Sequence, residues 1–202
     1  SEMATALVNG IITLMFNWTM LKYVGEDGVA AITIISYVLA FAGSLYAGYA
    51  YGVAPMLSFY YGEQNHEKLR KLVRTSLKII GVIAAATVLV SLAVTEPLVS
   101  IFARPGTPVY DLAVAGNRIC SLALLFVGFN IFASGMFTAL SNGLISAVLA
   151  FSRTFVFTLI AMLVLPVILG VTGIWLATPA AELAAIILSA VMLLKYRRRY
   201  CY

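Results

Sequence analysis

The sequence predicts an all-α membrane protein, a polytopic bundle of six transmembrane helices. The first observation is composition: 62% of the 202 residues are hydrophobic and only 10% are charged, whereas soluble domains are nearer half apolar and a quarter charged. The second is that the charges leave apolar runs of about 20 residues or more, the length that a helix needs to cross a bilayer. The third is that no segment alternates as β-barrel strands do. A mean hydropathy of +1.01 excludes an ordinary soluble enzyme.

Six helices follow one another along the chain, and most of them are separated by turns rich in glycine, proline or asparagine. These turns cover residues 25–28, 104–108, 141–143 and 170–173. The second helix comes from a charge-free run that is too long for one straight crossing and too short for two, and we expect Pro55 to kink it. The predicted helices cover residues 3–22, 29–61, 68–94, 109–139, 142–168 and 173–195 of a single transmembrane lobe, 1–202.

Lysine and arginine residues gather on one side of this layout. That side holds Lys68, Arg70, Lys71, Arg74 and Lys78 after the second helix, and Lys195, Arg197, Arg198 and Arg199 in the tail. The opposite side holds Lys22 and Arg104. Because basic residues are retained on the cytoplasmic side, we expect both termini in the cytoplasm and a multi-pass position in the plasma membrane.

Polar side chains recur on one face of the first helix. They are Glu2, Thr5, Asn9, Thr13 and Asn17, spaced by three or four residues. At about 100° per residue they share an arc of roughly 120°. Such a stripe lines an aqueous path or forms a hydrogen-bonded seam between helices, and the residues favour neither. Glu2 offers a carboxylate for a proton or a cation, but taken alone the favoured alternative is a position at the headgroup level.

On the second helix, Tyr37, Ser44 and Tyr51 recur every seven residues. Aromatic rings with polar tips can stack against lipophilic cations, so these residues are candidates for lining a cavity. The GxxxG spacing of Gly48 and Gly52 favours the alternative, in which this face packs closely against another helix.

The later helices carry a few further polar residues. Asn130 and Ser134 lie on one side of the fourth helix and are candidates for lining a cavity, as is Arg153, a cation deep in the fifth. For Arg153 the favoured alternative is a side chain that extends to the cytoplasmic surface. We expect Glu182 near the opposite surface, and Tyr46 in the aromatic belt at the membrane interface.

Motifs of enzymes are absent from the sequence. His66 is the only histidine and has no second ligand at metal-binding spacing, and neither a P-loop nor a dinucleotide-binding motif occurs. We therefore expect no enzymatic activity, no metal and no cofactor. The basic residues flank apolar runs, so we expect the lipid bilayer and not nucleic acid as a partner.

Several sequence blocks carry a resemblance to a known family. The most specific are GEDGVAAITIISY at 25–37 and GVAPMLSFYYGEQNHEKLRK at 52–71. Weaker blocks follow at 106–113, 139–154 and 165–182. In this order they resemble the C-terminal half of a multidrug and toxic compound extrusion (MATE) transporter.

The resemblance implies one lobe of a two-lobe transporter that exports small amphiphilic cations in exchange for Na⁺ or H⁺. Glu2 resembles an acidic residue early in the first helix of this lobe, which makes it the main candidate for ion coupling. Asn130 lies near an aspartate of some members and is the second candidate, whereas Arg153 resembles a basic residue to which no role is assigned. The implied partner is the missing N-terminal lobe or a second copy of the chain.

Two alternatives to drug export are open. A flippase for lipid-linked precursors shares the two-lobe design, but it should carry a cluster of cations in its cavity, for which the sequence offers only Arg153 and Arg118. The chain could also be a membrane subunit or fragment that transports nothing.

Overall fold

The structure is a computed structural model that describes the backbone of residues 2–200 and 202 and the side chains of residues 7–200 and 202. Every regular element in these residues is a helix. In chain order the elements are α1 (Glu2–Tyr23), α2 (Glu26–Gly62), α3 (His66–Ala93), α4 (Thr95–Phe102), α5 (Pro108–Cys120), η1 (Ser121–Ala123), α6 (Leu124–Ala139), α7 (Gly143–Phe151), η2 (Ser152–Phe157), α8 (Thr158–Leu169) and α9 (Val171–Tyr200).

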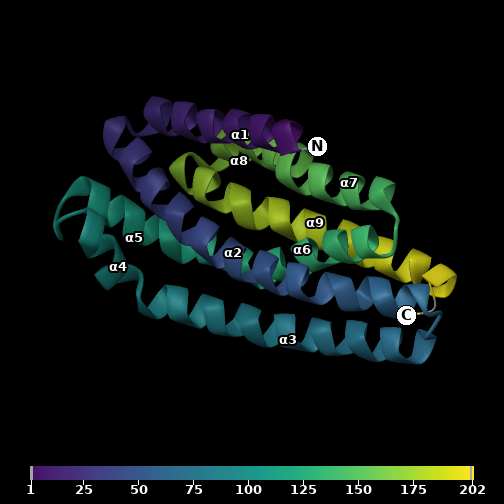
Figure 1. Cartoon of the computed structure of the whole chain (residues 1–202). Helices are drawn as coiled ribbons and strands as arrows, with labels where there is room; N and C mark the ends of the chain where they lie inside the picture. The colour runs from purple at the N-terminus through teal and green to yellow at the C-terminus, as the bar shows by residue number, and fades with distance from the viewer. Residues whose placement is uncertain (1, 201) are drawn as a thin grey trace.

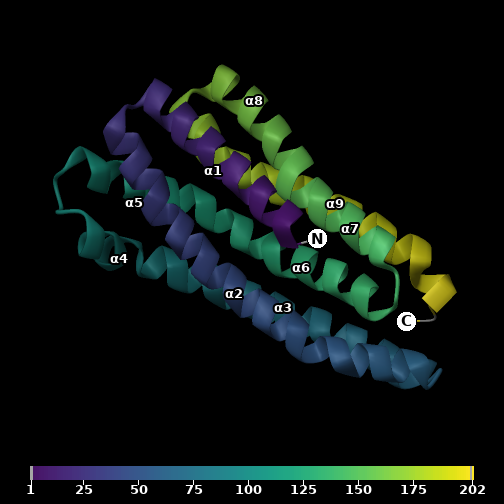
Figure 2. The ribbon, with the colours of Figure 1, turned by 45° about the horizontal axis from the view of Figure 1, so that its top comes forward.

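The helices form one elongated bundle (Figure 1). The helices α1, α7 and α8 lie on one side, α3 and α4 lie on the opposite side, and α2, α6 and α9 lie between them (Figures 1 and 2). The central helix α6 contacts α2, α3, α7 and α9. Its position places its side chains where they meet partners from most of the bundle.

The predicted bundle of six membrane helices is confirmed for the described residues. Five segments are long and apolar enough to cross a membrane: Glu26–Gly62, His66–Ala93, Pro108–Ala139, Gly143–Leu169 and Val171–Tyr200. The helix α1, with 22 residues, packs against α2, α8 and α9 as the sixth. The largest difference from the predicted ranges is at the end of the last helix, which continues to Tyr200 instead of ending at 195.

Side-chain caps and left-handed turns explain several helix ends. Asn65, Thr107 and Asn142 accept backbone N–H groups at the starts of α3, α5 and α7. Gly25 and Gly170 have φ values of 94° and 61°, in the region that favours glycine. The turns predicted at 25–28 and 170–173 are shorter in the structure, because α2 already begins at Glu26 and α9 at Val171.

The short helix α4 is not predicted by the sequence analysis, which assigns no element between the helix at 68–94 and the turn at 104–108. Thr95, at its start, is 1% exposed. The Thr95 hydroxyl donates to the Ser91 carbonyl at 2.6 Å and accepts from Asn117 Nδ2 at 2.9 Å. A helix of 8 residues is too short for a search based on membrane-spanning length, so only its contacts with α3 and α5 reveal it.

Tyr46 corrects a second expectation, because it lies in the core and not in an interfacial belt. Its side chain is 2% exposed. Its hydroxyl donates to the Leu124 carbonyl at 2.9 Å and shares a hydrogen bond with the Thr87 hydroxyl. Gly128 on α6 makes room for the ring: a Cβ at that position would lie 2.5 Å from a ring carbon of Tyr46.

Candidate functional site

A cluster of four polar side chains joins α6, η2 and α9 inside the bundle: Asn130, Arg153, Glu182 and Ser189. Glu182 Oε1 accepts from Arg153 Nε at 2.8 Å, and Glu182 Oε2 accepts from Asn130 Nδ2 at 2.7 Å. Ser189 Oγ donates to Asn130 Oδ1 at 3.0 Å. Asn130, Glu182 and Ser189 are buried, and the Arg153 side chain is 21% exposed. We refer to these four residues as the buried polar cluster.

The expected surface positions of Arg153 and Glu182 are therefore wrong. Glu182 is buried and Arg153 is partly buried, and each neutralises the charge of the other, while the second oxygen of the carboxylate accepts from Asn130. Arg153 lies in η2, a π-helical segment, and such segments change the direction in which the following side chains point. A signal was present in the sequence: Arg153 and Glu182 are charges of opposite sign, each alone within a long apolar stretch.

Asn130 is fully engaged within this cluster. Its amide nitrogen donates both to the Glu182 carboxylate and to the Glu182 carbonyl, the latter at 3.1 Å, and its oxygen accepts from Ser189. A carboxylate therefore lies beside Asn130 of α6, and it belongs to Glu182 of α9. Asn130 holds Glu182 in place, and any ion bound here would have to compete with Arg153.

Ser134 belongs to a smaller seam between α6 and α7. Its hydroxyl lies 3.0 Å from that of Ser146, which lies 2.7 Å from the Thr138 hydroxyl. The three hydroxyls satisfy one another, so Ser134 contributes to helix packing in this structure.

The polar stripe of α1 remains accessible where it is described. The side chains of Glu2 and Thr5 lie outside the described residues. Asn9 and Thr13 are exposed and Asn17 is half-buried. The Thr13 hydroxyl donates to the Asn9 carbonyl at 2.8 Å, and Thr13 and Asn17 border a cavity of about 190 Å³ between α1, α2, α5 and α9.

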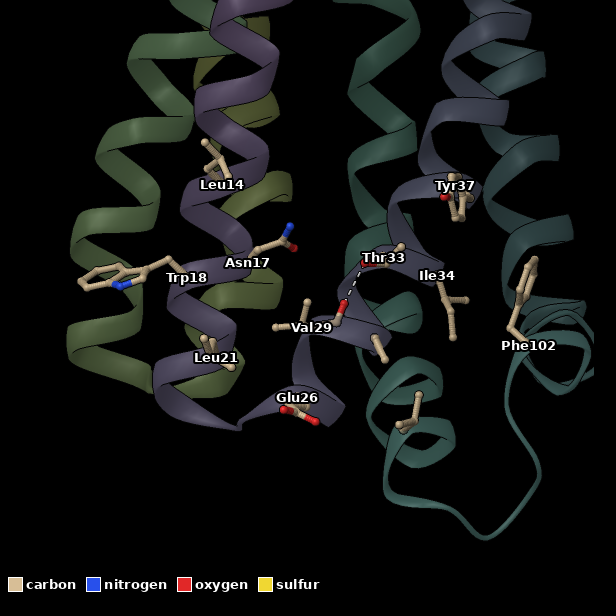
Figure 3. Close-up of a pocket in the computed structure, with 12 residues that line it drawn as sticks. Leu14, Asn17, Trp18, Leu21, Glu26, Val29, Thr33, Ile34, Tyr37 and Phe102 are labelled. Carbon is tan, nitrogen blue, oxygen red and sulfur yellow. Dashed lines mark hydrogen bonds between the residues drawn. The ribbon is translucent and has the colours of Figure 1, made fainter.

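A larger cavity of about 720 Å³ lies between α1 and α2, beside the turn that joins them. We call it the α1–α2 groove. Figure 3 shows Asn17 directed into the space between the two helices, Tyr37 on the α2 side and Glu26 near the turn. Trp18 and Phe102 add aromatic surface. The groove thus combines aromatic rings, one amide and one carboxylate in a largely apolar setting.

The candidates on α2 share one exposed face. Tyr37 and Tyr51 are 63% and 75% exposed, and Ser44 is exposed with its hydroxyl donating to the Ala40 carbonyl at 2.9 Å. A Cβ added at Gly48 or Gly52 would meet nothing within 4 Å. The close packing that the GxxxG spacing favours is therefore not made within the described part of the chain.

The sequence pattern of the MatE family matches residues 3–164. The chain belongs to the MatE family. It is accordingly a multi-pass membrane protein with a transporter fold. A comparison with curated proteins gives no match.

Solved structures have the same fold at low sequence identity. An outward-facing multidrug resistance MATE family transporter of the MOP superfamily aligns with a TM-score of 0.86 at 23% identity, over 96% of this chain and 43% of that chain. A mutant of the Vibrio cholerae MATE transporter VcmN aligns with a TM-score of 0.88 at 18% identity, over 98% of this chain and 44% of that chain. A MOP superfamily transporter from Pyrococcus furiosus gives 0.85 at 22% identity, over 96% and 43%.

The chain thus spans less than half the length of these transporters, and nearly all of it is aligned. The predicted fold, one lobe of a two-lobe MATE-type transporter, is confirmed. MatE proteins are transporters, so the family agrees with the expectation of a non-enzymatic protein.

Proposed function

We propose that the chain is one lobe of a secondary transporter that exports cationic amphiphilic drugs or other xenobiotics in exchange for Na⁺ or H⁺. The observation that carries this proposal is the match to the MatE family over most of the chain, together with the matching fold. The fold aligns almost equally well with an outward-facing and an inward-facing MATE transporter, with TM-scores of 0.86 and 0.85. This supports a lobe that keeps its fold while its position relative to the other lobe changes.

The α1–α2 groove suits a cationic amphiphile by its chemistry. Trp18, Tyr37 and Phe102 offer aromatic surface, which can bind apolar groups and, through the ring faces, cations. Lys22 Nζ lies 5.6 Å from the centroid of the Trp18 ring, so a cation already occupies one ring face at this end of α1. Glu26 supplies a carboxylate at the edge of the groove.

The exposed face of α2 is the surface that we assign to the rest of the transporter. Gly48 and Gly52 leave its centre without side chains that would hold another helix away. We propose that an N-terminal lobe, or a second copy of this chain, lies opposite this face. The cavity for the substrate would then be bounded by Tyr37, Ser44 and Tyr51 together with the α1 stripe.

We propose Glu2 as the carboxylate that couples ion movement to export. A bare carboxylate in a dehydrated interface is unfavourable, and binding of H⁺ or Na⁺ relieves this cost. Ion and drug would then favour different arrangements of the lobes. Asn130 is the second candidate, and its hydrogen bonds mean that it would act through the Glu182 carboxylate.

Basic residues gather at 68–78 and 195–199, and this supports a cytoplasmic position for both termini in the plasma membrane.

Drug export is favoured over the flipping of lipid-linked precursors because two arginines are already paired with carboxylates. Arg153 is paired with Glu182 and Arg118 with Glu96. Neither is left as a free cation for a diphosphate headgroup.

The test uses proteoliposomes that contain the chain together with an N-terminal lobe, loaded with ethidium under an imposed Na⁺ or H⁺ gradient. Glu2→Gln should abolish gradient-driven efflux while ethidium binding persists, and Asp111→Asn, which changes an exposed acid at the opposite end, should leave efflux unchanged. Full efflux by Glu2→Gln removes this residue from the mechanism. An inserted, folded protein that moves no dye under either gradient contradicts the proposed transport and favours the non-transporting subunit.

A further inference from the structure

Two adjoining cavities lie at the end of the bundle that holds the C-terminus. One measures about 420 Å³ and the other about 330 Å³. They share Leu194, Arg197 and Tyr202 as lining residues, so they form one continuous hollow between α3 and α9. Figure 1 shows the first turns of α3 and the last turns of α9 at this same end. We refer to the hollow as the α3–α9 pocket.

The two parts of this pocket differ in chemistry. Arginines dominate the first: Arg70 lines it from α3, and Arg197 and Arg198 line it from α9. Arg74, one turn after Arg70, borders the second part. The second part is otherwise mainly apolar, and its lining includes Val73, Leu77, Leu193 and Leu194.

Tyr202 connects the two parts. Its side chain is 8% exposed, and its hydroxyl donates to the Leu193 carbonyl at 2.9 Å. The ring is therefore held against α9 as a wall of the pocket, and both cavities border it.

Three arginines of the pocket, Arg70, Arg74 and Arg197, have no acidic partner among the described residues. The ion pairs found in the described part of the chain are those of Arg118 and Arg153, and no carboxylate there lies within 4 Å of Arg70, Arg74 or Arg197. Neighbouring cations are placed differently: Lys195 and Arg199 lie over the rings of Tyr196 and Tyr200 and do not line the pocket.

We propose that the α3–α9 pocket binds one anionic phospholipid. Arginine guanidinium groups bind phosphate oxygens through paired N–H donors, so Arg70, Arg74 and Arg197 would hold the headgroup phosphate. The leucine- and valine-lined part would take the first segment of an acyl chain. Basic pockets between membrane helices have this preference in general, whereas a soluble phosphate would use only the arginine part. The proposal does not depend on the transport function.

The test measures retention of phosphatidylglycerol, relative to phosphatidylcholine, by native mass spectrometry of the purified full chain released from mixed micelles. The pocket variant is Arg70→Gln/Arg74→Gln/Arg197→Gln. Its matched control, Lys71→Gln/Lys78→Gln/Arg199→Gln, removes the same number of charges from the same helices outside the pocket. At roughly a tenfold contribution or less per basic residue, the pocket variant should lose phosphatidylglycerol retention by about tenfold or more. The control should keep most of it.

Each other outcome overturns the proposal. Equal losses in both variants would show diffuse attraction of anionic lipid to a basic surface, and no loss in the pocket variant would show that the arginines do not bind the lipid. Displacement of phosphatidylglycerol by inorganic phosphate, with equal binding of phosphate by the protein in neutral lipid, would identify a soluble anion as the ligand.

A second variant changes the shape of the pocket without removing any charge, and its melting temperature shows whether it is still folded. Leu194→Trp places a large ring at the junction of the two parts of the pocket, on a residue that is 70% exposed. It should lower phosphatidylglycerol retention severalfold while leaving the melting temperature in neutral lipid unchanged. Retention equal to that of the unmodified chain would contradict a seat for the acyl chain.

Discussion

The buried polar cluster and the α1–α2 groove both contain polar residues of apolar helices, but the hydrogen bonds of these residues differ in the two regions. In the cluster, Asn130, Arg153 and Glu182 satisfy one another across three elements. In and beside the groove, hydroxyls such as that of Thr33 donate back to the carbonyl of their own helix, here Val29 at 2.8 Å. The first arrangement joins helices, and the second leaves a polar surface accessible. The role of a polar residue in a membrane helix therefore depends on whether its hydrogen-bond partner lies on another helix or on its own.

The largest effect should come from breaking the ion pair of the cluster. Glu182→Leu leaves the partly buried Arg153 without its carboxylate and leaves Asn130 with only the backbone carbonyl at 182 as an acceptor. Removal of one partner of a buried pair costs about 3–5 kcal/mol, and we expect a loss of this order in the free energy of unfolding, measured by denaturant titration in mixed micelles.

The double variant Glu182→Leu/Arg153→Met separates the charge effect from packing. Because apolar replacement of both partners is often close to neutral, it should recover most of the lost stability. Asp111→Asn, at an exposed acid, serves as the control and should change little. If Glu182→Leu proves as stable as the unmodified chain, the cluster does not hold α9 to η2.

A smaller effect should distinguish the two glycine positions that face a packed and an open surface. An added Cβ at Gly128 would lie 2.5 Å from the Tyr46 ring, which its two hydrogen bonds hold in place. Overpacking of this kind costs about 1–3 kcal/mol, so Gly128→Ala should lower the melting temperature. Gly48→Ala, where a Cβ meets nothing within 4 Å, should not. Equal melting temperatures for the two variants would contradict the close approach of α2 and α6.

The smallest change in stability should come from the α1–α2 groove. Asn17→Ala and Tyr37→Ala alter accessible side chains with no hydrogen bond to another helix among the described contacts, so each should shift the unfolding free energy by only about 0.5 kcal/mol. Under the proposed function they should nevertheless weaken ethidium binding, measured by fluorescence polarisation. Val167→Ala, on the exposed face of α8, is the control. Unchanged ethidium binding in both groove variants would place the substrate elsewhere.

Much of the fold follows from local features of the sequence. The length of the apolar runs predicts the membrane helices because hydrocarbon thickness sets a minimum span. Glycine and asparagine at the turns predict where most of them end. The family resemblance predicts the lobe, and the MatE match together with the aligned structures confirms it. The stripe on α1 is likewise a matter of local periodicity, although the roles of Glu2 and Asn130 in ion coupling stay predictions.

The candidate site was less predictable. Arg153 and Glu182 are 29 residues apart in the chain, and no periodicity within one helix relates them. The π-helical geometry of η2 and the space that Gly128 leaves for Tyr46 are likewise set by contacts between helices.

The sequence by itself therefore determined which segments cross the membrane and which side chains share a face, because both depend on distances along a single helix. Only the tertiary structure decided which of those faces are closed and which are open. The cost of burying a charge depends on whether a partner from a distant helix reaches it. For Glu182 such a partner does, whereas the described polar residues of the α1–α2 groove receive no such partner from a distant helix.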